Sequence, residues 1–326
     1  MGLLVFVAAA VILILLFSLY TYKICFHAPK NHTEDPYHIP DSEQYKNVGE
    51  RMNGITRIME SAECEFITIT AWDGNTLSGR FYEYYPSAPM LLVFHGYRSS
   101  TLRDCAGGFA LGQKLGFNVL AVDQRSHGKS TGRVITFGIR ERYDCLDWIA
   151  YVNNRFGAET PIILSGISMG AATVLMASEL NLPQNVAGIM ADCPYSSPAD
   201  IICKVAGEIG YPPKLAYPLI RLGARIYGGF RVTECTAVDA VRKATVPILL
   251  IHGEDDRFVP CDMSREIYEN CKEVAQLHTF PGAGHGLCYI SDPRRYERIC
   301  VDFLWSLKPL PPFLEKSDFA KTIRSA

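Results

Sequence analysis

The feature that most constrains the fold is a five-residue segment, G-I-S-M-G at residues 166–170, which joins two different kinds of sequence. It follows the apolar run 161–164 and precedes the small-residue run 171–177, a pattern that predicts a buried strand, a tight turn and a helix. Side chains next to the serine would collide in so sharp a turn, so glycine is needed on both sides. We expect Ser168 to have a strained backbone and an outward-pointing hydroxyl.

Short apolar runs alternate with helix-length segments along the rest of the chain. The runs lie at residues 90–94, 118–123, 161–164, 186–192, 246–252 and 275–280. Apolar runs without polar alternation indicate strands that helices cover on both faces. Before them, two alternating segments at 65–71 and 77–85 flank Asp73-Gly74, which predicts a hairpin. The fold class expected is therefore α/β: a mostly parallel, doubly wound sheet with an N-terminal antiparallel hairpin.

The interval between residues 192 and 246 is far longer than one crossover helix needs. Two short apolar helices are predicted within it, at 201–210 and 218–227, separated by Tyr211-Pro212-Pro213. An insertion here would lie over the carboxyl ends of the strands, where open α/β sheets bind their ligands. Residues 196–245 are therefore expected to form a small helical cap that shapes the substrate pocket.

The N-terminal segment carries no charged residue from Gly2 to Tyr22. A helix of about 20 apolar residues spans the hydrocarbon layer, and the segment lacks the basic start and small-residue cleavage site of a signal peptide. We therefore expect a single-pass membrane anchor at 1–22 rather than a cleaved signal. A linker and helix at 23–63, a catalytic domain at 64–307 and a tail at 308–326 would follow.

Two patterns favour a cytoplasmic catalytic domain over an extracellular one. Lys23 and Lys30 follow the apolar segment and no basic residue precedes it, as the positive-inside rule requires. The 11 cysteines are odd in number and lack C-x-x-C pairs, and Cys145, Cys203 and Cys300 lie in apparent core segments. This usage indicates buried thiols rather than a disulfide framework.

Composition excludes one class of partner and implies no cofactor. The formal net charge is −2, and no basic run interleaved with aromatic residues is present, so nucleic-acid binding is not expected. His32, Glu34, Asp35 and His38 could suggest a metal site, but we interpret them as a solvated linker because no rigid element fixes their geometry. Neither a metal nor an organic cofactor is implied.

A nucleophilic serine needs a base within hydrogen-bond reach and a third group that orients the base. His285 is the predicted base because it lies in a glycine-rich loop directly after the last strand. His252 ends a strand and His278 lies inside one, which are structural positions. His95 and His127 precede the serine and suit loop and turn roles.

The acid is expected after the strand that ends near residue 252. Asp255 and Asp256 are neighbours there, and spacing alone cannot choose between them. Asp192, at the end of the preceding strand, is a rival. Backbone donors for the oxyanion are expected from Met169, at the start of a helix, and from Tyr97, in the loop after the strand 90–94.

Together these motifs resemble the α/β-hydrolase superfamily from about residue 65 to 307. Residues 95–97 (H-G-Y) are similar to its oxyanion loop, 123–130 (D-Q-R-S-H-G-K-S) to its D-x-R-x-H-G-x-S turn, and 166–170 to its nucleophile elbow. Residues 252–260 resemble H-G-x-x-D-x-x-V-P, and Gly284-His285 completes the set. The resemblance implies a Ser168–Asp256–His285 triad and decides for Asp256 over Asp255.

The residues that make up these motifs, including D-C-P-Y-S-S at 192–197, resemble those of bacterial membrane-anchored hydrolases. Within the superfamily, this resemblance lies near the serine-aminopeptidase-like and prolyl-oligopeptidase-like branches. Many members of these branches are carboxylesterases. The chain lacks the β-propeller region of prolyl oligopeptidases and has one glycine where some lipases have H-G-G-G. These differences argue against peptidase activity and against lipase activity on bulky lipids.

The function expected is hydrolysis of a small carboxylic ester through an acyl-enzyme. Amide or peptide cleavage, acyl transfer and thioester hydrolysis use the same triad and remain alternatives. A peptidase would be expected to place carboxylates for a substrate amine, and the predicted cap offers only Glu208, Glu234 and Asp239. A non-catalytic, membrane-tethered binding protein is a further alternative, although no triad residue is missing.

Overall fold

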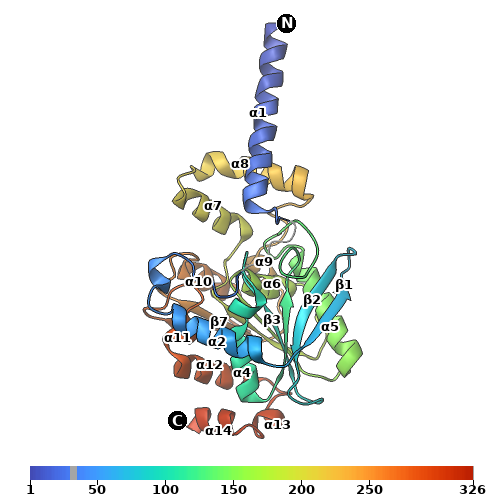
Figure 1. Ribbon diagram of the computed structural model, residues 1–326, viewed down its shortest axis with the longest axis vertical. Coiled ribbons are helices and arrows are strands. Elements are labelled where there is room, and N and C mark those ends of the chain that lie inside the picture. The colour runs from blue at the N-terminus through green and yellow to red at the C-terminus, as the bar shows by residue number, and fades with distance from the viewer. Residues whose placement is uncertain (30–34, 326) are drawn as a thin grey trace.

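An eight-stranded mixed sheet forms the centre of the molecule (Figure 1). The structure is a computed structural model that describes residues 1–29 and 35–325. The strands lie in the order β1-β2-β4-β3-β5-β6-β7-β8; the pairs β1–β2 and β2–β4 are antiparallel and the other neighbouring pairs are parallel. The strands are β1 (Glu65–Thr70), β2 (Thr76–Tyr82), β3 (Met90–Phe94), β4 (Asn118–Asp123), β5 (Ile162–Ile167), β6 (Val186–Asp192), β7 (Ile248–Gly253) and β8 (Ala275–Phe280). The predicted fold class, a mostly parallel sheet led by a hairpin, is confirmed.

Helices cover both faces of the sheet, as the apolar strands require. One face carries α5 (Glu141–Phe156), α6 (Met169–Ala177), α9 (Ala237–Val241) and α10 (Cys261–Glu269). The other carries α2 (Gly49–Ser61), α3 (Thr101–Asp104), α4 (Ala106–Leu115), α11 (Cys288–Ser291) and α12 (Pro293–Ser306). Each face buries its own apolar core, so every residue of β3 is buried.

Several element bounds differ from those expected, for local reasons. β7 begins at Ile248 because Pro247 has no amide hydrogen to donate to a neighbouring strand. β5 continues past Leu164 to Ile167, pairing with β6 up to the residue before the serine. The helix expected within residues 23–63 is a 3₁₀ turn, η1 (Glu43–Tyr45), followed by α2.

The predicted C-terminal tail is largely helical. It forms α13 (Pro311–Leu314) and α14 (Asp318–Ser325), which contact α12 and α4. Leu314 and Ala320 are fully buried in the core on that side of the sheet. These last residues therefore pack onto the body formed by the sheet and its helices.

Two short helices and one turn stand above the carboxyl ends of the strands. They are α7 (Pro198–Glu208), α8 (Pro213–Gly223) and the π-helical turn η2 (Ala224–Gly228), and Figure 1 shows α7 and α8 between the sheet and the N-terminal helix. The expected start of the second helix at residue 218 is wrong. Pro213 occupies the first helical turn, where proline needs no amide hydrogen, and Pro218 is tolerated inside the helix. We call α7, α8 and η2 the cap.

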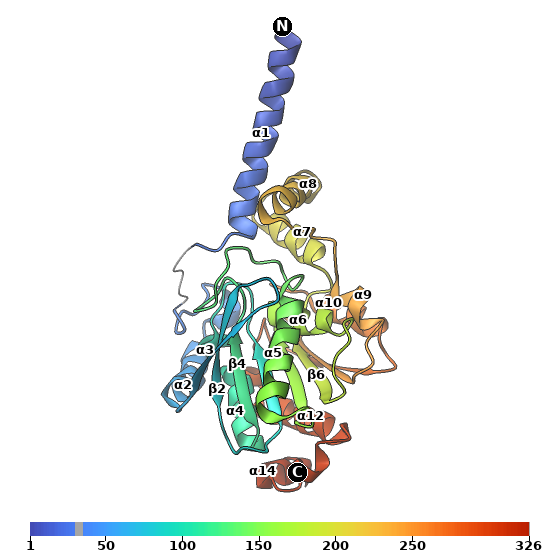
Figure 2. The same ribbon diagram turned by 90° about the vertical axis from the view of Figure 1, so that its right-hand side faces the viewer.

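The N-terminal helix α1 (Gly2–Cys25) projects away from the body, and the two chain ends lie at opposite ends of the molecule (Figure 2). Among the residues that the structure describes, it is the one helix long and apolar enough to cross a membrane. Its C-terminal part packs against α8, where a side chain on Gly223 would approach the Ser18 carbonyl oxygen to 2.3 Å. The Tyr227 hydroxyl donates to the Leu15 carbonyl at 3.2 Å.

Candidate active site

Ser168 occupies the turn between β5 and α6 in the strained conformation that the sequence predicts. Its φ is 55° and its ψ is −117°, a region that residues with a side chain rarely adopt. A Cβ on Gly166 would lie 2.3 Å from the backbone of Gly170, and a Cβ on Gly170 would lie 2.1 Å from the Phe94 carbonyl oxygen. Backbone contacts of this kind cannot relax, so both glycines are required.

His285 lies in the loop between β8 and α11, with its ring over the serine. Its Nε2 is 3.0 Å from the Ser168 hydroxyl oxygen, a hydrogen-bond distance. Two residues of the N-terminal linker hold this loop: the Gln44 side-chain carbonyl accepts from the His285 amide at 2.9 Å, and the Tyr45 hydroxyl donates to the His285 carbonyl at 3.0 Å. The histidine that contacts the serine is thus fixed by a segment distant in sequence.

Asp256 follows β7 and orients the other side of the imidazole. Its Oδ2 lies 2.7 Å from His285 Nδ1, and its Oδ1 accepts from the amides of Phe258 and Val259 at 2.8 Å each. Burial alone would raise its pKa, but the charge of His285 and the hydrogen bonds from His252 and His285 outweigh burial and hold the pKa of Asp256 well below its ordinary value. The carboxylate is therefore ionised at neutral pH.

The other two acid candidates have different surroundings. Asp255 is exposed, so only its backbone takes part in the loop. Asp192 is buried, and within the described part of the chain its Oδ1 has no hydrogen-bond partner. Burial raises the pKa of Asp192 to about 6, an effect that His252 and the Tyr296 phenol partly offset. The structure brings Asp256, not Asp192 or Asp255, to His285.

The loop after β3 brings backbone next to the nucleophile. A Cβ on Gly96 would lie 3.3 Å from the Ser168 Cβ and 2.8 Å from Asp104 Oδ2, so only glycine fits comfortably. The Gly96 amide donates to Asp104 at 2.8 Å and the Arg98 amide donates to His127 at 3.0 Å. Within the described residues no acceptor is found for the Tyr97 amide between them.

Met169 is the first residue of α6, directly after the serine. The first amides of a helix have no partner within the helix, so the Met169 N–H is available to an outside acceptor. The two amides predicted to bind an oxyanion therefore flank Ser168, one from the loop after β3 and one from α6.

The remaining histidines have structural partners, as the sequence indicates for them. His95 Nε2 accepts from the Gln124 amide at 3.0 Å, which ties the loop after β3 to the turn after β4. Burial, followed by the neighbouring His95, lowers the pKa of His127 to about 3, so its neutral ring can accept from Arg98. His252 is fully buried, with Nδ1 2.6 Å from the Ser264 hydroxyl, and His278 lies within β8.

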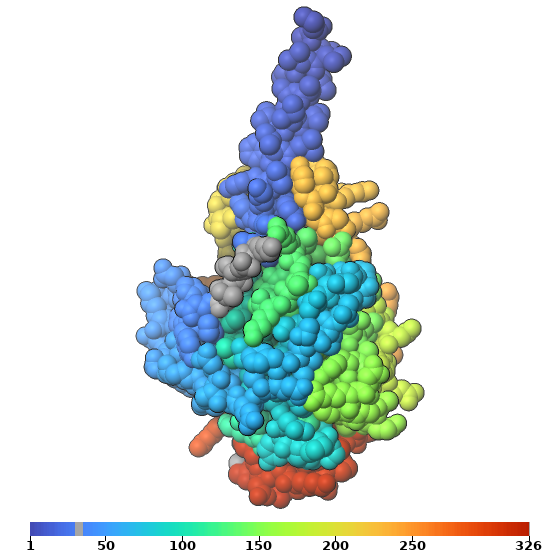
Figure 3. All heavy atoms as spheres, turned by 45° about the vertical axis from the view of Figure 1, so that its right-hand side comes forward, coloured from blue at the N-terminus to red at the C-terminus, as the bar shows by residue number. Residues whose placement is uncertain are grey.

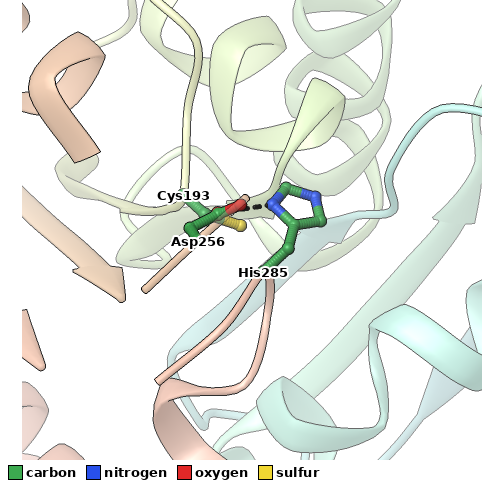
Figure 4. A group of neighbouring side chains, drawn as sticks. All are labelled: Cys193, Asp256 and His285. Atoms are coloured by element: carbon green, nitrogen blue, oxygen red, sulfur yellow. Dashed lines mark hydrogen bonds and ion pairs between the residues drawn. The ribbon is translucent and has the colours of Figure 1, made fainter. Parts of the chain in front are cut away.

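Cys193 is an unexpected neighbour of this group. Figure 4 draws it beside Asp256 and His285, and the three ligand-type atoms lie within 4.8 Å of one another. Burial, with the nearby Asp192 and Asp256 carboxylates, raises the pKa of the Cys193 thiol well above its ordinary range. A neutral thiol is a poor metal ligand, and His285 Nδ1 is engaged by Asp256, so we interpret this group as a thiol packed against the hydrogen-bonded Asp256 and His285 side chains.

The other cysteines are also free, as the sequence predicts. All eleven are unpaired; Cys145 and Cys300 are buried, and Cys203 is half-buried. Of the four linker residues that could suggest a metal site, His32 and Glu34 lie outside the described residues. Asp35 instead accepts a hydrogen bond from the Tyr37 amide at 2.9 Å.

Two cavities meet at Ser168. One, of about 490 Å³, lies under the linker and is lined by polar groups that include Arg103, Asp104 and Asp192. The other, of about 570 Å³, lies between α1 and the cap and is lined mainly by apolar side chains. Both fall within the size range of small-molecule sites, and the nucleophile lies at their junction.

The connection between α1 and the loop after β3 could not be read from the sequence. The Tyr97 hydroxyl donates to the Cys25 carbonyl at 2.8 Å, and Arg98 Nη2 donates to the Ile24 carbonyl at 2.7 Å. These bonds occupy carbonyls at the end of α1 that have no partner within the helix. The Tyr97 phenol thus holds the end of α1. Gln44 and Tyr45 were likewise missed, because no local pattern distinguishes them.

Comparisons with known proteins give one family-model match and several relatives. A model of the Alpha/beta hydrolase family matches residues 90–299. An uncharacterized protein of Bacillus subtilis is 23% identical over 81% of this chain and 87% of its own length, and human ABHD12B is 27% identical over 68% of this chain and 63% of its own length. The protein bem46 of Schizosaccharomyces pombe is 24% identical over 78% of this chain and 81% of its own length.

Solved structures of similar fold include esterases. An esterase of Pyrococcus furiosus superposes with a TM-score of 0.61 at 24% identity, covering 76% of this chain and 94% of its own. Est1E of Butyrivibrio proteoclasticus, solved with ferulic acid, superposes with a TM-score of 0.57 at 21% identity, covering 74% and 99%. At such identities the likeness establishes the fold alone.

Proposed function

We propose that this chain, which belongs to the alpha/beta hydrolase family, is a serine hydrolase. It would cleave carboxylic esters through a covalent acyl-enzyme. The observation that carries the proposal is the continuous chain of hydrogen bonds from the Ser168 hydroxyl through His285 to Asp256, at 3.0 and 2.7 Å. A base within reach of a serine and oriented by a buried carboxylate is the arrangement that activates a hydroxyl nucleophile.

In the first half of the reaction, Ser168 Oγ attacks the ester carbonyl while His285 Nε2 takes its proton. The carbonyl oxygen becomes an oxyanion and receives hydrogen bonds from the amides of Tyr97 and Met169. The tetrahedral intermediate collapses, and His285 returns the proton to the departing alcohol. Asp256 stays ionised and stabilises the imidazolium that forms between these steps.

In the second half, water takes the place of the alcohol. His285 removes a proton from the water as it attacks the acyl-enzyme carbonyl, and the same two amides bind the second oxyanion. Collapse releases the carboxylic acid and returns the proton to Ser168. Every step uses Ser168, His285, Asp256 or the two backbone amides, and none needs a metal or an organic cofactor.

Carboxylates of the cap region favour ester cleavage over peptide cleavage. Glu208 is paired with Lys204 at 2.7 Å, and Asp239 is paired with Arg242 at 2.8 Å. Glu234 lies 3.6 Å from Arg142. A carboxylate already paired with a cation is a weak partner for the amino group of a peptide substrate.

Hydrolysis of 4-nitrophenyl acetate by wild type and by Ser168→Ala tests the proposal. We expect the variant to lose at least about a thousandfold in kcat, since removing a triad member abolishes most of the acceleration. A fluorophosphonate probe should label wild type and fail to label the variant. Equal hydrolysis rates in the two proteins would contradict the proposal.

We also propose that α1 anchors the chain in a membrane by a single pass, with the catalytic domain on the cytoplasmic side. The helix has 24 residues, or about 36 Å at 1.5 Å per residue, which exceeds the hydrocarbon thickness. Lys23 in its last turn supports this orientation. A C-terminal fluorescent-protein fusion should fluoresce and a C-terminal alkaline phosphatase fusion should be inactive in a bacterial host; the reverse pattern would overturn the orientation.

A further inference from the structure

The larger cavity reaches Ser168 from the side of α1. Its walls come from three helices, with Ile24 on α1, Ala206 on α7, and Ala216 and Leu219 on α8, and Ser168 lies at one end. Among the described residues that line it, Arg98 alone is charged, and its guanidinium is bonded to carbonyls at the end of α1. A cavity of this volume with few polar groups accommodates a hydrocarbon chain better than a polar substrate.

The length of α1 sets the depth at which this cavity opens. Contact with the cap begins at Leu15, whose carbonyl accepts from Tyr227, so only about 13 residues, or roughly 20 Å, project freely beyond it. The hydrocarbon layer is about 30 Å thick. A helix that spans this layer therefore carries its last third, which packs beside α8 (Figure 3), into the membrane.

The exposed side chains of the cap suit a position at the membrane surface. Ile209, Tyr211, Leu215 and Ile226 are exposed large apolar side chains on or between α7, α8 and η2, and Leu215 is 72% exposed. Arg221 and Arg225 follow in the same segment, and their cationic groups can reach lipid headgroups from an interfacial helix. Such a surface is costly in water and favourable at a bilayer interface.

The second cavity restricts the alcohol part of the substrate. It meets the first at Ser168, and its lining combines apolar side chains such as Leu91, Val93 and Met190 with the charged groups of Arg103, Asp104 and Asp192; the linker residues Pro40, Ser42 and Gln44 also line it. A small alcohol fits this cavity, whereas the folded surface of a protein substrate does not. The loop after β3 has one glycine where some lipases have H-G-G-G. This difference does not limit the length of the acyl chain, because the hydrocarbon chain approaches Ser168 from the α1 side.

We propose that the cap lies in the membrane surface and that the substrate is a fatty acyl ester of a membrane lipid. The acyl chain occupies the cavity between α1, α7 and α8, and the ester carbonyl lies at Ser168. This inference rests on the proposed function and adds the substrate class to it. It also differs from the sequence-based expectation, which argues against lipase activity on bulky lipids.

Chain-length selectivity of the full-length protein in ether-lipid vesicles tests the inference. The probes are 4-methylumbelliferyl palmitate and 4-methylumbelliferyl acetate, compared in wild type, Ala216→Trp and the control Thr233→Trp. Ala216 lines the cavity, and Thr233 is an exposed residue of the predicted cap insertion that does not. We expect kcat/KM in wild type to favour palmitate by about tenfold or more, as filling an apolar site does.

Ala216→Trp should lower the palmitate-to-acetate ratio of kcat/KM by about tenfold, while Thr233→Trp leaves the ratio unchanged. A ratio unaffected by Ala216→Trp, or a wild-type preference for acetate, would overturn the inference and leave the proposed function standing. Wild-type turnover of neither ester would contradict the proposed function itself, and the inference would fall with it. Preferential cleavage of a palmitoyl-cysteine peptide over palmitoylglycerol would overturn the assignment to lipid.

Fluorescence quenching tests whether the cap lies in the membrane surface. Leu215→Trp introduces a fluorophore on α8, and lipids brominated near the headgroup end of their chains should quench its added fluorescence. Trp72, Trp148 and Trp305 give the background, which the wild-type protein measures directly. Absence of additional quenching in the variant would place α8 outside the bilayer and overturn the inference.

Discussion

At the scale of single residues, the site depends on how each side chain is held rather than on which residues are present. Asp256 has both oxygens occupied, by two backbone amides and by imidazole nitrogens. Asp192, at the end of β6, is the rival acid in the sequence. It is buried, and one of its carboxylate oxygens has no hydrogen-bond partner in the described part of the chain. Two aspartates that the sequence treats as rivals therefore have different pKa shifts and different expected roles.

Replacing the two aspartates separately should distinguish those roles. Asp256→Asn should lower kcat on 4-nitrophenyl acetate by about 10⁴-fold, because the imidazole loses its orientation and its stabilising charge. Asp192→Asn should lower kcat by less than about tenfold, since no hydrogen bond joins Asp192 to His285. A larger loss in Asp192→Asn than in Asp256→Asn would show that the acid has been assigned wrongly.

Asp192 also predicts a pH dependence of stability. Its pKa is raised to about 6 in the folded protein, against an ordinary value of 3.8. The folded chain thus binds this proton more tightly than the unfolded chain, so the contribution to stability is full below about pH 4 and is lost as the pH rises to about 6. A two-unit shift corresponds to roughly 3 kcal/mol.

Urea unfolding of wild type and Asp192→Asn in detergent between pH 4 and pH 8 checks this. The free energy of unfolding of the variant, relative to wild type, should increase by up to about 3 kcal/mol as the pH rises, with most of the change between pH 4 and 6. Parallel pH curves for the two proteins would mean that Asp192 titrates normally.

At the scale of elements, the loop after β3 is held from two sides. Asp104 and His127 accept hydrogen bonds from backbone amides of the loop. The Tyr97 and Arg98 side chains of the same loop donate to carbonyls at the end of α1. The position of the Tyr97 amide, a proposed oxyanion donor, thereby depends on the N-terminal helix. An element expected to serve only as an anchor is directly bonded to the candidate active site.

Tyr97→Phe tests that connection without altering the backbone amide. Loss of the hydrogen bond to Cys25 should lower the free energy of unfolding by about 1 kcal/mol and kcat by a few-fold, with little change in KM for a short ester. Tyr20→Phe is the control, because the Tyr20 hydroxyl is exposed and its contact with Tyr211 is long, at 3.5 Å. Equal kcat values in the two variants would show that α1 does not position the loop.

The contact between α1 and α8 gives a second prediction at this scale. In Gly223→Val the new side chain meets the Ser18 carbonyl, so the helices must separate at a cost of about 1–3 kcal/mol in the free energy of unfolding. Gly207→Ala on α7 is the control, because its new methyl group would lie 3.5 Å from Pro213 at the closest. Similar unfolding midpoints for Gly223→Val and wild type would contradict close packing of these helices.

At the scale of the whole molecule, local sequence predicts the sheet and the order of its elements well. The elbow is predictable because it needs only neighbours in sequence: a strand, two glycines and a helix of small residues. His285 and the pair Asp255–Asp256 are predictable because each follows a strand of the same sheet, and the carboxyl ends of parallel strands meet at one edge. The choice of Asp256 over Asp255 came from the family resemblance.

Contacts between distant segments could not be predicted in this way. Gln44 meets His285 only because the linker folds back over the sheet, and Tyr97 meets Cys25 only because α1 ends beside the loop after β3. The bounds of the cap helices were also uncertain, since proline can begin a helix as readily as end one. These relations depend on tertiary packing, which leaves no periodic or compositional pattern in the sequence.

The whole arrangement predicts one covalent event, acylation of Ser168. Full-length protein in detergent, treated with a fluorophosphonate probe and digested, should carry the label on the peptide that contains Ser168, as peptide mass spectrometry would show. Asp256→Asn should be labelled much more slowly, and Ser168→Ala should not be labelled at all. Label on a different residue, or an unlabelled wild-type protein that still hydrolyses esters, would contradict the account.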